Sequence, residues 1–442
     1  MGSDDQRPGG SSSDAIQRHR RYGGKMQTIL KCPIQGASDF ATWYTPGVAE
    51  PCRAIQASPE AVYELTNKGN LVAVVSDGSR VLGLGDIGPE AGLPVMEGKS
   101  LLFKYLGGVD AVALCLATRT VDDLVQAVEW LAPSFGAINL EDIAQPKCFR
   151  VLEALRQRLP IPIWHDDQQG TATVVLAGLM NALQVTGRDF KTTRIAMVGA
   201  GAANIATYKL LTAYGVAPGQ IVVCDSRGIL GPDRTDIEAS SSLYPEKWQI
   251  CRETNAARRS GGIAEALAGS DVCLAFSQPG PDIIKAEWVR HMAADAIVFA
   301  CANPVPEIWP QAALAAGARI VATGRSDFKN QVNNSLVFPG MFRGVLDVRA
   351  RAINETMAIA AARALAGYGV ALGLTAERIL PAMDDPETAV RVAVAVALSA
   401  QAQGLADLSH DEATIRRMAE RAIGRARGDC AALFPADKDS ER

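Results

Sequence analysis

RIAMVGAGAAN, at residues 194–204, gives the most specific indication of the fold of this chain. Its first half is a short apolar run typical of a buried strand, and the helix-favouring sequence IATYKLLTAYG follows the second half. Gly199 and Gly201 permit a tight turn between the two. Asn204 stands where a third glycine or alanine would complete the usual pattern, so the turn alone leaves a merely structural role open.

The residues after this turn favour a dinucleotide site. The next predicted strand, Gln220 to Cys224, ends in Asp225, where an acidic residue commonly binds the adenosine ribose hydroxyls. The pyrophosphate would lie at the N-terminus of the intervening helix. Asp225 favours NAD, whereas Arg227 could accept the 2′-phosphate of NADP, so both cofactors stay open. The expected cofactor-binding residues are Gly199, Gly201, Ala202, Ala203, Asn204 and Asp225.

The wider pattern predicts an α/β protein. From about residue 190, β-branched runs such as QIVVCD and AIVFAC alternate with Ala-rich helical stretches, which indicates a Rossmann-type, doubly wound parallel sheet. Strands and amphipathic helices upstream indicate a second α/β domain, and the almost purely helical C-terminal part is expected to pack back on it. We therefore expect a disordered segment at 1–26, a substrate domain at 27–166, a dinucleotide domain at 167–340 and C-terminal helices at 341–442.

Composition excludes several classes of protein. The 442 residues hold 44 basic and 48 acidic side chains, without the basic excess of a nucleic-acid binder. No apolar run reaches the ~18 residues that span a bilayer, and no signal-peptide core is present, so no membrane partner is expected. The nine cysteines form no CxxC pair, which fits a reducing, cytoplasmic setting.

Two acidic pairs directly follow predicted strands. Glu141-Asp142 comes after Ala137 to Leu140, and Asp166-Asp167 after the run that ends in Trp164. Carboxylates at neighbouring strand ends can converge on one hard cation, for which Mg²⁺ or Mn²⁺ is the natural choice. Because aspartate also caps helices well, helix N-capping is the alternative interpretation.

Lys99 and Tyr44 are ambiguous when taken alone. Lys99 follows a glycine and precedes the apolar stretch LLFKYL, so it is either a solvated lysine at a helix start or a general base. A neighbouring divalent ion could lower its pKa towards neutrality, as a base requires. Tyr44, in the sequence WYTPG, has the usual alternative of a half-buried packing residue.

Taken together, the sequence resembles the malic enzyme family, in particular its short bacterial members. The resemblance runs from about residue 27 to 365, through motifs in the family's order. These are YTPGVAEPC, SDGSRVLGLGDIG, PVMEGKSLLFK, INLEDI, HDDQQGTA, GAGAANIA, ACANPVPEI and NQVNNSLVFPG. Gln169 departs from the family pattern, because short bacterial members usually have histidine at this place.

The resemblance implies a role for each matching residue. Glu141, Asp142 and Asp167 match metal ligands, Lys99 the general base, and Asp166 the neighbour that orients the lysine. Tyr44 matches the acid that protonates the enol. The implied contacts with substrate or nicotinamide come from four further residues: Arg80, which clamps the substrate carboxylate, Asn303 and Asn334, which contact substrate and nicotinamide, and Asn333 beside them.

The reaction that this resemblance implies is metal-dependent oxidative decarboxylation of (S)-malate to pyruvate and CO₂ with reduction of NAD or NADP. A related dehydrogenase of another metal-chelating 2-hydroxy acid, and a malolactic enzyme that releases lactate, share the same residues and stay open. A non-catalytic nucleotide sensor would need the dinucleotide site alone, so retention of the lysine, tyrosine and carboxylates speaks against it. Relatives in the family suggest a homodimer or a larger even homo-oligomer.

Overall fold

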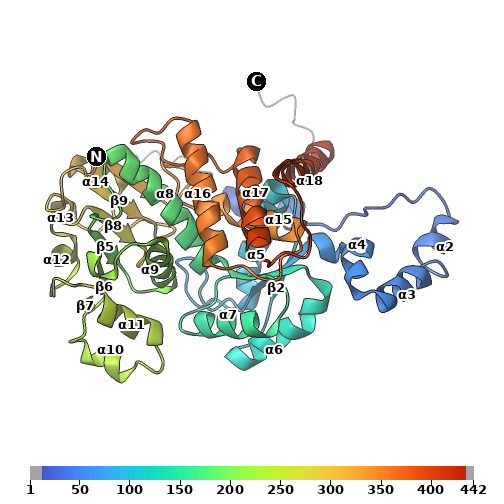
Figure 1. Cartoon of the computed structure of the whole chain (residues 1–442), viewed down its shortest axis with the longest axis horizontal. Helices are drawn as coiled ribbons and strands as arrows, with labels where there is room; N and C mark the ends of the chain where they lie inside the picture. The colour runs from blue at the N-terminus through green and yellow to red at the C-terminus, as the bar shows by residue number, and fades with distance from the viewer. Residues whose placement is uncertain (1–11, 435–442) are drawn as a thin grey trace.

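The structure, a computed structural model, describes residues 12–434. Ser12–Tyr22 forms helix α1, so the predicted disorder of residues 1–26 is wrong for this part; residues 1–11 lie outside the described chain. The segment up to the first sheet then contains α2 (Asp39–Trp43), α3 (Ala49–Ala57), α4 (Val62–Leu65) and the 3₁₀ turns η1 (Pro59–Ala61) and η2 (Asn67–Asn70). Figure 1 shows α2 and α3 at one end of the molecule, outside its body.

The first sheet has four parallel strands in the order β2-β1-β3-β4. Its central strand β1 is apolar and inaccessible from Val72 to Val75, as expected for a parallel sheet covered on both faces. The helices that follow its strands are α5, α6 and α7, with a short turn η3 after α6. The bounds are β1 (Leu71–Ser76), α5 (Pro89–Gly107), β2 (Asp110–Cys115), α6 (Val121–Leu131), η3 (Ala132–Ser134), β3 (Ala137–Leu140), α7 (Lys147–Arg158) and β4 (Ile163–His165).

The second sheet has six strands in the order β10-β9-β8-β5-β6-β7, and five of them are parallel. Its last strand β7 is antiparallel to β6, a local departure from the expected all-parallel sheet. The chain leaves β5 towards β6 and returns on the other side at β8, which opens a crevice at the carboxyl ends of β5 and β8. The strands are β5 (Ile195–Val198), β6 (Ile221–Asp225), β7 (Gly228–Ile229), β8 (Val272–Ala275), β9 (Ile297–Ala300) and β10 (Ile320–Thr323).

Helices surround this second sheet and link it to the first. Helix α8 is buried along most of its length and joins the two halves, which explains its nearly continuous apolar sequence. The helices and turns around the second sheet are η4 (Asp166–Gly170, a π-helical turn), α8 (Thr171–Thr186), α9 (Ala202–Tyr214), η5 (Pro218–Gln220), α10 (Thr235–Ala239), α11 (Pro245–Glu253), α12 (Ile263–Leu267), α13 (Ala286–Val289), α14 (Pro310–Ala315) and η6 (Asn334–Leu336).

The C-terminal helices pack back on the first domain and make it discontinuous in sequence. They are α15 (Phe338–Asp347), α16 (Glu355–Ala371), α17 (Pro386–Ala402) and α18 (Glu412–Leu433). The Phe103 ring of α5 packs against Phe338 and Phe342 of α15, with centroids 4.6 and 4.9 Å apart. Arg343 also donates to Asn70 Oδ1 at 2.6 Å. The packing of these three rings joins α5 to α15, and both helices lie near the middle of the molecule (Figure 1).

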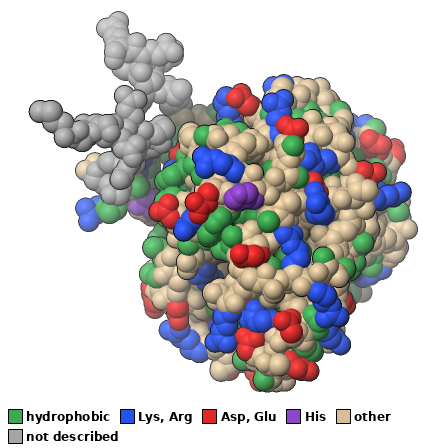
Figure 2. All heavy atoms as spheres, turned by 90° about the vertical axis from the view of Figure 1, so that its left-hand side faces the viewer, with side chains coloured by type: hydrophobic (Ala, Val, Ile, Leu, Met, Phe, Trp, Pro, Cys, Tyr) green, Lys and Arg blue, Asp and Glu red, His purple; other side chains and the backbone are tan. Residues whose placement is uncertain are grey.

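The surface carries both signs of charge. On the face shown in Figure 2, Lys and Arg side chains are interspersed with Asp and Glu rather than gathered in one basic area. Within residues 12–434, no helix is long and apolar enough to cross a bilayer.

Candidate functional site

Three carboxylates meet at the carboxyl edge of the first sheet. Glu141 and Asp142 follow β3, and Asp167 follows β4, the neighbouring strand. One oxygen from each of them lies within 4.8 Å of the others. Asp142 takes a left-handed backbone conformation (φ 54°), and its N–H donates to Asp167 Oδ2 at 2.8 Å. The expected convergence of these residues is therefore present in the structure.

The cluster has the chemistry of a site for a divalent cation. Asp142 Oδ2 is buried and has no hydrogen-bond partner within the described part of the chain. Burial, together with the neighbouring Asp167 carboxylate, raises the pKa of Asp142 to about 8, and burial likewise raises the pKa of Glu141. Three carboxylates that offer only oxygen atoms and whose negative charges repel one another suit Mg²⁺ or Mn²⁺. The capping alternative does not hold for the first pair, since α7 begins at Lys147 with Pro146 at its N-cap position.

Lys99 lies in the interior of α5 and not at a helix start, because the helix already begins at Pro89 and includes Gly98. The side chain is buried, and its Nζ lies 2.7 Å from Asp166 Oδ2 and 2.9 Å from Glu141 Oε1. Burial alone would lower the pKa of Lys99, but the carboxylates of Asp166 and Glu141 outweigh it and raise that pKa. The lowering expected from the sequence depends on a neighbouring divalent ion, whose positive charge would oppose the effect of these carboxylates.

Asp166 is held from both sides. Trp164 Nε1 donates to Asp166 Oδ1 at 2.9 Å, while Lys99 occupies Oδ2. A Cβ on Gly170 would lie 2.0 Å from Asp166 Oδ1 and 3.1 Å from Asn334 Cβ, so only glycine leaves room for this carboxylate. Because both atoms lie next to Gly170, Asn334 of the second domain is close to Asp166.

Arg80 and Asn303 belong to two loops that meet across the cleft. The Arg80 N–H donates to the Asp142 carbonyl at 3.1 Å, which fixes the Arg80 loop to the carboxylate cluster. A Cβ on Gly83 would lie 2.6 Å from the Asn303 carbonyl oxygen, so the two loops touch. Both residues therefore lie where the domains face each other.

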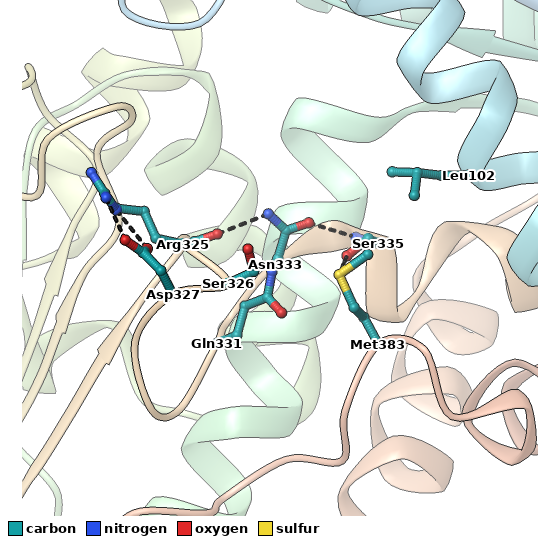
Figure 3. Close-up of a pocket in the computed structure, with 9 residues that line it drawn as sticks. Leu102, Arg325, Ser326, Asp327, Gln331, Asn333, Ser335 and Met383 are labelled. Carbon is teal, nitrogen blue, oxygen red and sulfur yellow. Dashed lines mark hydrogen bonds and ion pairs between the residues drawn. The ribbon is translucent and has the colours of Figure 1, made fainter. Parts of the chain in front are cut away.

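Asn333 lines a cavity of about 340 Å³ between the domains, together with Leu102, which lies one turn after Lys99 on α5. Its amide nitrogen donates to the Gly324 carbonyl at 2.9 Å, and its oxygen accepts from Ser335 N at 2.9 Å (Figure 3). Because both ends of the amide are engaged, Asn333 shapes the wall of the cavity.

The glycine turn has the geometry of a dinucleotide loop. Gly199 has φ 98°, and a Cβ there would lie 2.6 Å from the Phe276 carbonyl oxygen. A Cβ on Gly201 would meet nothing within 4 Å, so the backbone there borders open space in which a pyrophosphate could approach. The side chain of Asn204 is buried and donates back to the carbonyls of Val198 and Gly199, so it braces the turn.

Asp225 ends β6 as expected, but its carboxylate is already engaged. Arg234 pairs with both oxygens at 3.0 Å, and Lys247 Nζ lies 2.5 Å from Oδ2. The Arg227 N–H donates to Oδ1 at 2.9 Å. Although burial opposes it, these partners lower the pKa of Asp225. Asp225 as a ribose acceptor stays a prediction, and its two cationic partners, nine and 22 residues along the chain, were not part of that prediction.

Tyr44 is the predicted site residue that one chain does not bring to the others. It follows α2 on the segment outside the body, and 71% of it is exposed. Asp225 ends β6, the strand beside the glycine turn, and the other predicted residues lie at the carboxylate cluster, where the two domains face each other, or in the glycine turn.

Several buried polar residues of this site escaped the sequence analysis. Asn139 donates to Glu141 Oε2 at 2.9 Å. Glu307 accepts from Ser277 N and Ala302 N at 2.7 and 3.0 Å, and it thereby joins two loops of the second domain. Glu307 falls within the motif ACANPVPEI, so its acidic side chain in an apolar run was the available signal.

The fold and the glycine turn are those of an α/β protein that binds a dinucleotide. Family models of the malic enzyme N-terminal domain and of the malic enzyme NAD-binding domain match residues 23–156 and 168–402. The chain belongs to the malic enzyme family.

Individual relatives agree with this assignment. The bifunctional malic/malolactic enzyme of Bacillus subtilis is 47% identical, over 90% of this chain and 95% of that protein. The NAD-dependent malic enzyme of Geobacillus stearothermophilus is 46% identical, over 87% and 78%. The NADP-dependent malic enzyme of Rhizobium meliloti is 44% identical, and the match covers 87% of this chain and 51% of that longer protein. The crystal structure of Entamoeba histolytica malic enzyme superimposes with a TM-score of 0.93 at 44% identity, over 97% of this chain and 89% of that one.

Proposed function

We propose that this protein catalyses oxidative decarboxylation of (S)-malate to pyruvate and CO₂ with NAD or NADP as hydride acceptor. The observation that carries the proposal is the buried Lys99, paired with Asp166 and Glu141, directly beside three converging carboxylates. A sensor of dinucleotides would need none of these buried charges, which are unfavourable unless they serve chemistry.

Glu141, Asp142 and Asp167 would hold a divalent cation such as Mg²⁺ or Mn²⁺. When bound, the cation would supply Lewis-acid polarisation of the substrate's 2-oxygen. Its positive charge would offset the negative charge of the carboxylates that raise the pKa of Lys99. The unpartnered oxygen of Asp142 supports this assignment.

The remaining groups are placed for proton transfer and orientation. Lys99 accepts the proton of the 2-hydroxyl at Nζ as hydride leaves for the nicotinamide, and Asp166 keeps Nζ in position. Arg80 holds a substrate carboxylate, and the amides of Asn303 and Asn334 orient substrate and nicotinamide from the second domain. Loss of CO₂ then leaves an enolate carbon, which Tyr44 protonates.

The ribose site supports use of both dinucleotides. Arg234 and Lys247 offset the charge of Asp225, so a 2′-phosphate meets little repulsion there. Arg227 pairs with Asp236 at 3.1 Å, but 72% of its side chain is exposed, and such an exposed ion pair is weak enough to be exchanged for a contact with a 2′-phosphate. Relatives named as NAD-dependent and as NADP-dependent malic enzymes match this chain about equally well.

A second candidate is malolactic conversion, in which NADH stays bound and reduces pyruvate to lactate. The observation in its favour is the 47% identical relative, which is named a bifunctional malic/malolactic enzyme. The two activities differ only in whether the reduced dinucleotide leaves before the second hydride transfer.

One assay tests both candidates. The metal-loaded protein is given malate with NAD or NADP, and NAD(P)H absorbance, CO₂, pyruvate and lactate are measured. We expect equal amounts of NAD(P)H, CO₂ and pyruvate; lactate with CO₂ and no net NADH would indicate malolactic conversion. Oxidation of other 2-hydroxy acids in preference to malate would contradict the proposal.

The absence of disulfides among residues 12–434 agrees with the reducing cytoplasm, where we propose that the reaction takes place.

A further inference from the structure

A cavity of about 360 Å³ lies between the two domains, apart from the residues predicted for the active site. Its walls come from α7 of the first domain, α9 and α11 of the second, the π-helical turn η4 and the C-terminal helix α16; the four α-helices are labelled in Figure 1. This volume is in the range of pockets that bind small molecules. None of the residues that line this cavity, here called the α7–α9 cavity, is predicted to bind metal, substrate or dinucleotide. The proposed reaction therefore does not account for it.

Gln168, in η4, brings an unpartnered amide to the α7–α9 cavity. Only 4% of this residue is exposed, and its Nε2 has no hydrogen-bond partner within residues 12–434. The buried Nε of Arg156, on α7, has none there either. A buried donor without a partner is unfavourable, because it has lost its hydrogen bonds to water and gained none in the protein. Since both groups are donors, an occupant with oxygen acceptors, such as a carboxylate, would satisfy them.

Two side chains of opposite charge line the cavity without neutralising each other. Lys209, on α9, and Glu246, on α11, form no ion pair with each other or with another residue of the described chain. Lys209 Nζ lies 5.9 Å from the centroid of the Phe149 ring, on α7. An unpaired cation and an unpaired carboxylate in one cavity suit an occupant that carries one charge of each sign. Glu153 and Glu355 also line the cavity, so a polyanion such as a nucleotide is unfavourable there.

The rest of the wall contains buried apolar side chains. Phe149 and Leu152 come from α7, and Ile205 and Leu210 come from α9. An aliphatic or aromatic group that packs on them is removed from water, which favours binding. A carboxylate, an ammonium group and an apolar body are together the parts of an apolar α-amino acid.

We propose that the α7–α9 cavity binds an apolar α-amino acid as its zwitterion, and that its occupancy raises the affinity of the carboxylate cluster for a divalent cation. Gln168 and Lys209 receive the carboxylate of the ligand, Glu246 receives its ammonium group, and the apolar side chains of α7 and α9 receive its body.

Two features couple this cavity to the carboxylate cluster. Gln168 directly follows Asp167 in η4, so a ligand that fixes Gln168 also restricts its neighbour. A ligand held by both α7 and α9 also favours the arrangement of the domains in which Glu141, Asp142 and Asp167 converge. By linkage, the cation must strengthen amino-acid binding by the same factor. This coupling rests on the proposed function, whereas binding of the amino acid does not.

Calorimetric titration of the full chain in the presence of a chelator tests the ligand class. The probes are leucine and phenylalanine, each beside the analogue that lacks the ammonium group (4-methyl-2-oxopentanoate, phenylpyruvate) and the analogue that lacks the carboxylate (isopentylamine, phenethylamine). We expect one of the amino acids to bind with a Kd of about 1 mM or lower, and both of its analogues to bind at least tenfold more weakly. No binding of either amino acid, or equal binding of an analogue, would overturn the proposal.

Variants of the cavity wall place the ligand. Lys209→Ala should weaken amino-acid binding at least tenfold, and Ala206→Phe, which fills the cavity from α9, should abolish it. Lys191→Ala is the matched control, because Lys191 is an exposed lysine of the same domain that does not line the cavity. Circular dichroism verifies that each variant is folded. If Lys209→Ala and Lys191→Ala bind the amino acid equally well, the cavity is not its site.

The coupling is measured without turnover, from the signal of free Mn²⁺ in electron paramagnetic resonance. We expect saturating amino acid to tighten Mn²⁺ binding at least fivefold in the wild type and to leave it unchanged in Lys209→Ala. If Mn²⁺ binds equally tightly with and without the amino acid, the coupling is refuted. If the amino acid binds but Mn²⁺ does not bind at all, the proposed function fails and the amino-acid site stands.

Discussion

The Lys99 ammonium lies 2.7 Å from Asp166 Oδ2, in a site where the Asp166 side chain is inaccessible and only 9% of the Lys99 side chain is exposed. Such a buried pair is costly to break, because the remaining charge is left without a partner. Asp166 directly follows β4 of the first sheet, and α5 packs on β1 and β2 of the same sheet, so packing within the first domain fixes the geometry of the pair.

Replacing Lys99 by alanine should lower kcat/KM for malate by roughly 10²–10⁴, because the proton acceptor is lost before hydride can leave. Lys104→Ala is the control, since Lys104 lies on the same helix and pairs with Asp110 outside the cleft; its kcat/KM should stay within about twofold of the wild type. Steady-state kinetics with both dinucleotides, and circular dichroism to verify folding, provide the measurement. A Lys99→Ala enzyme as active as Lys104→Ala would refute the role of Lys99.

Gly170→Ala should disable the site without touching substrate. Its Cβ would lie 2.0 Å from Asp166 Oδ1 and must push this carboxylate away from Trp164 and Lys99. Misplacement of a catalytic group by about 1 Å costs on the order of 10²-fold in rate. Gly367→Ala, where a Cβ meets nothing within 4 Å inside α16, should keep full activity and gain about 0.5–1 kcal/mol of stability. Steady-state kinetics and thermal unfolding of the two variants, measured under the same conditions, test both expectations.

Stabilisation by Mg²⁺ should grow as the pH rises towards 8. Burial and Asp167 raise the pKa of Asp142 to about 8, above its unfolded value near ~4, so between these two pH values the metal-free folded state binds a proton that the unfolded state does not. The free energy of unfolding of the metal-free protein therefore falls as the pH rises through this range. Cation binding needs the carboxylate form and relieves this penalty, so its affinity rises over the same range.

The measurement is the increase in Tm on adding Mg²⁺ at pH 6, 7 and 8.5. We expect a small increase at pH 6 and the largest at pH 8.5, and Asp142→Asn should abolish it. An equal increase at all three pH values would show that Asp142 does not exchange a proton for the cation.

Arg227→Ala should separate the two dinucleotides. The exposed guanidinium of Arg227 would make a charge-assisted contact with a 2′-phosphate, which NAD lacks, so KM for NADP should rise about 10- to 100-fold while KM for NAD stays unchanged. Arg252→Ala, on the neighbouring helix α11, is the control. Parallel changes in both KM values would mean that Arg227 acts on the fold of the loop and not on the phosphate.

The sequence by itself determined the second sheet and the glycine turn. Short apolar runs with period-two or continuous burial report strands locally, and Gly199 must adopt a backbone conformation that other residues avoid, so both signals are contained in a few neighbouring residues. The same locality placed Glu141, Asp142 and Asp167 together, since the carboxyl ends of adjacent parallel strands necessarily share one edge of a sheet.

Tertiary structure alone decided three further points. The charge state of Lys99 depends on carboxylates 42 and 67 residues along the chain, which local spacing does not register. Asp225 ends its strand as predicted, but its ion pairs with Arg234, at the N-cap of α10, and with Lys247, on α11, appear only in the folded chain. Tyr44 belongs to a clear motif, yet it follows α2 on a segment outside the body of the chain, a position that the local sequence does not register. The interactions that decide these points join segments that are distant in the sequence, and only folding brings such segments into contact.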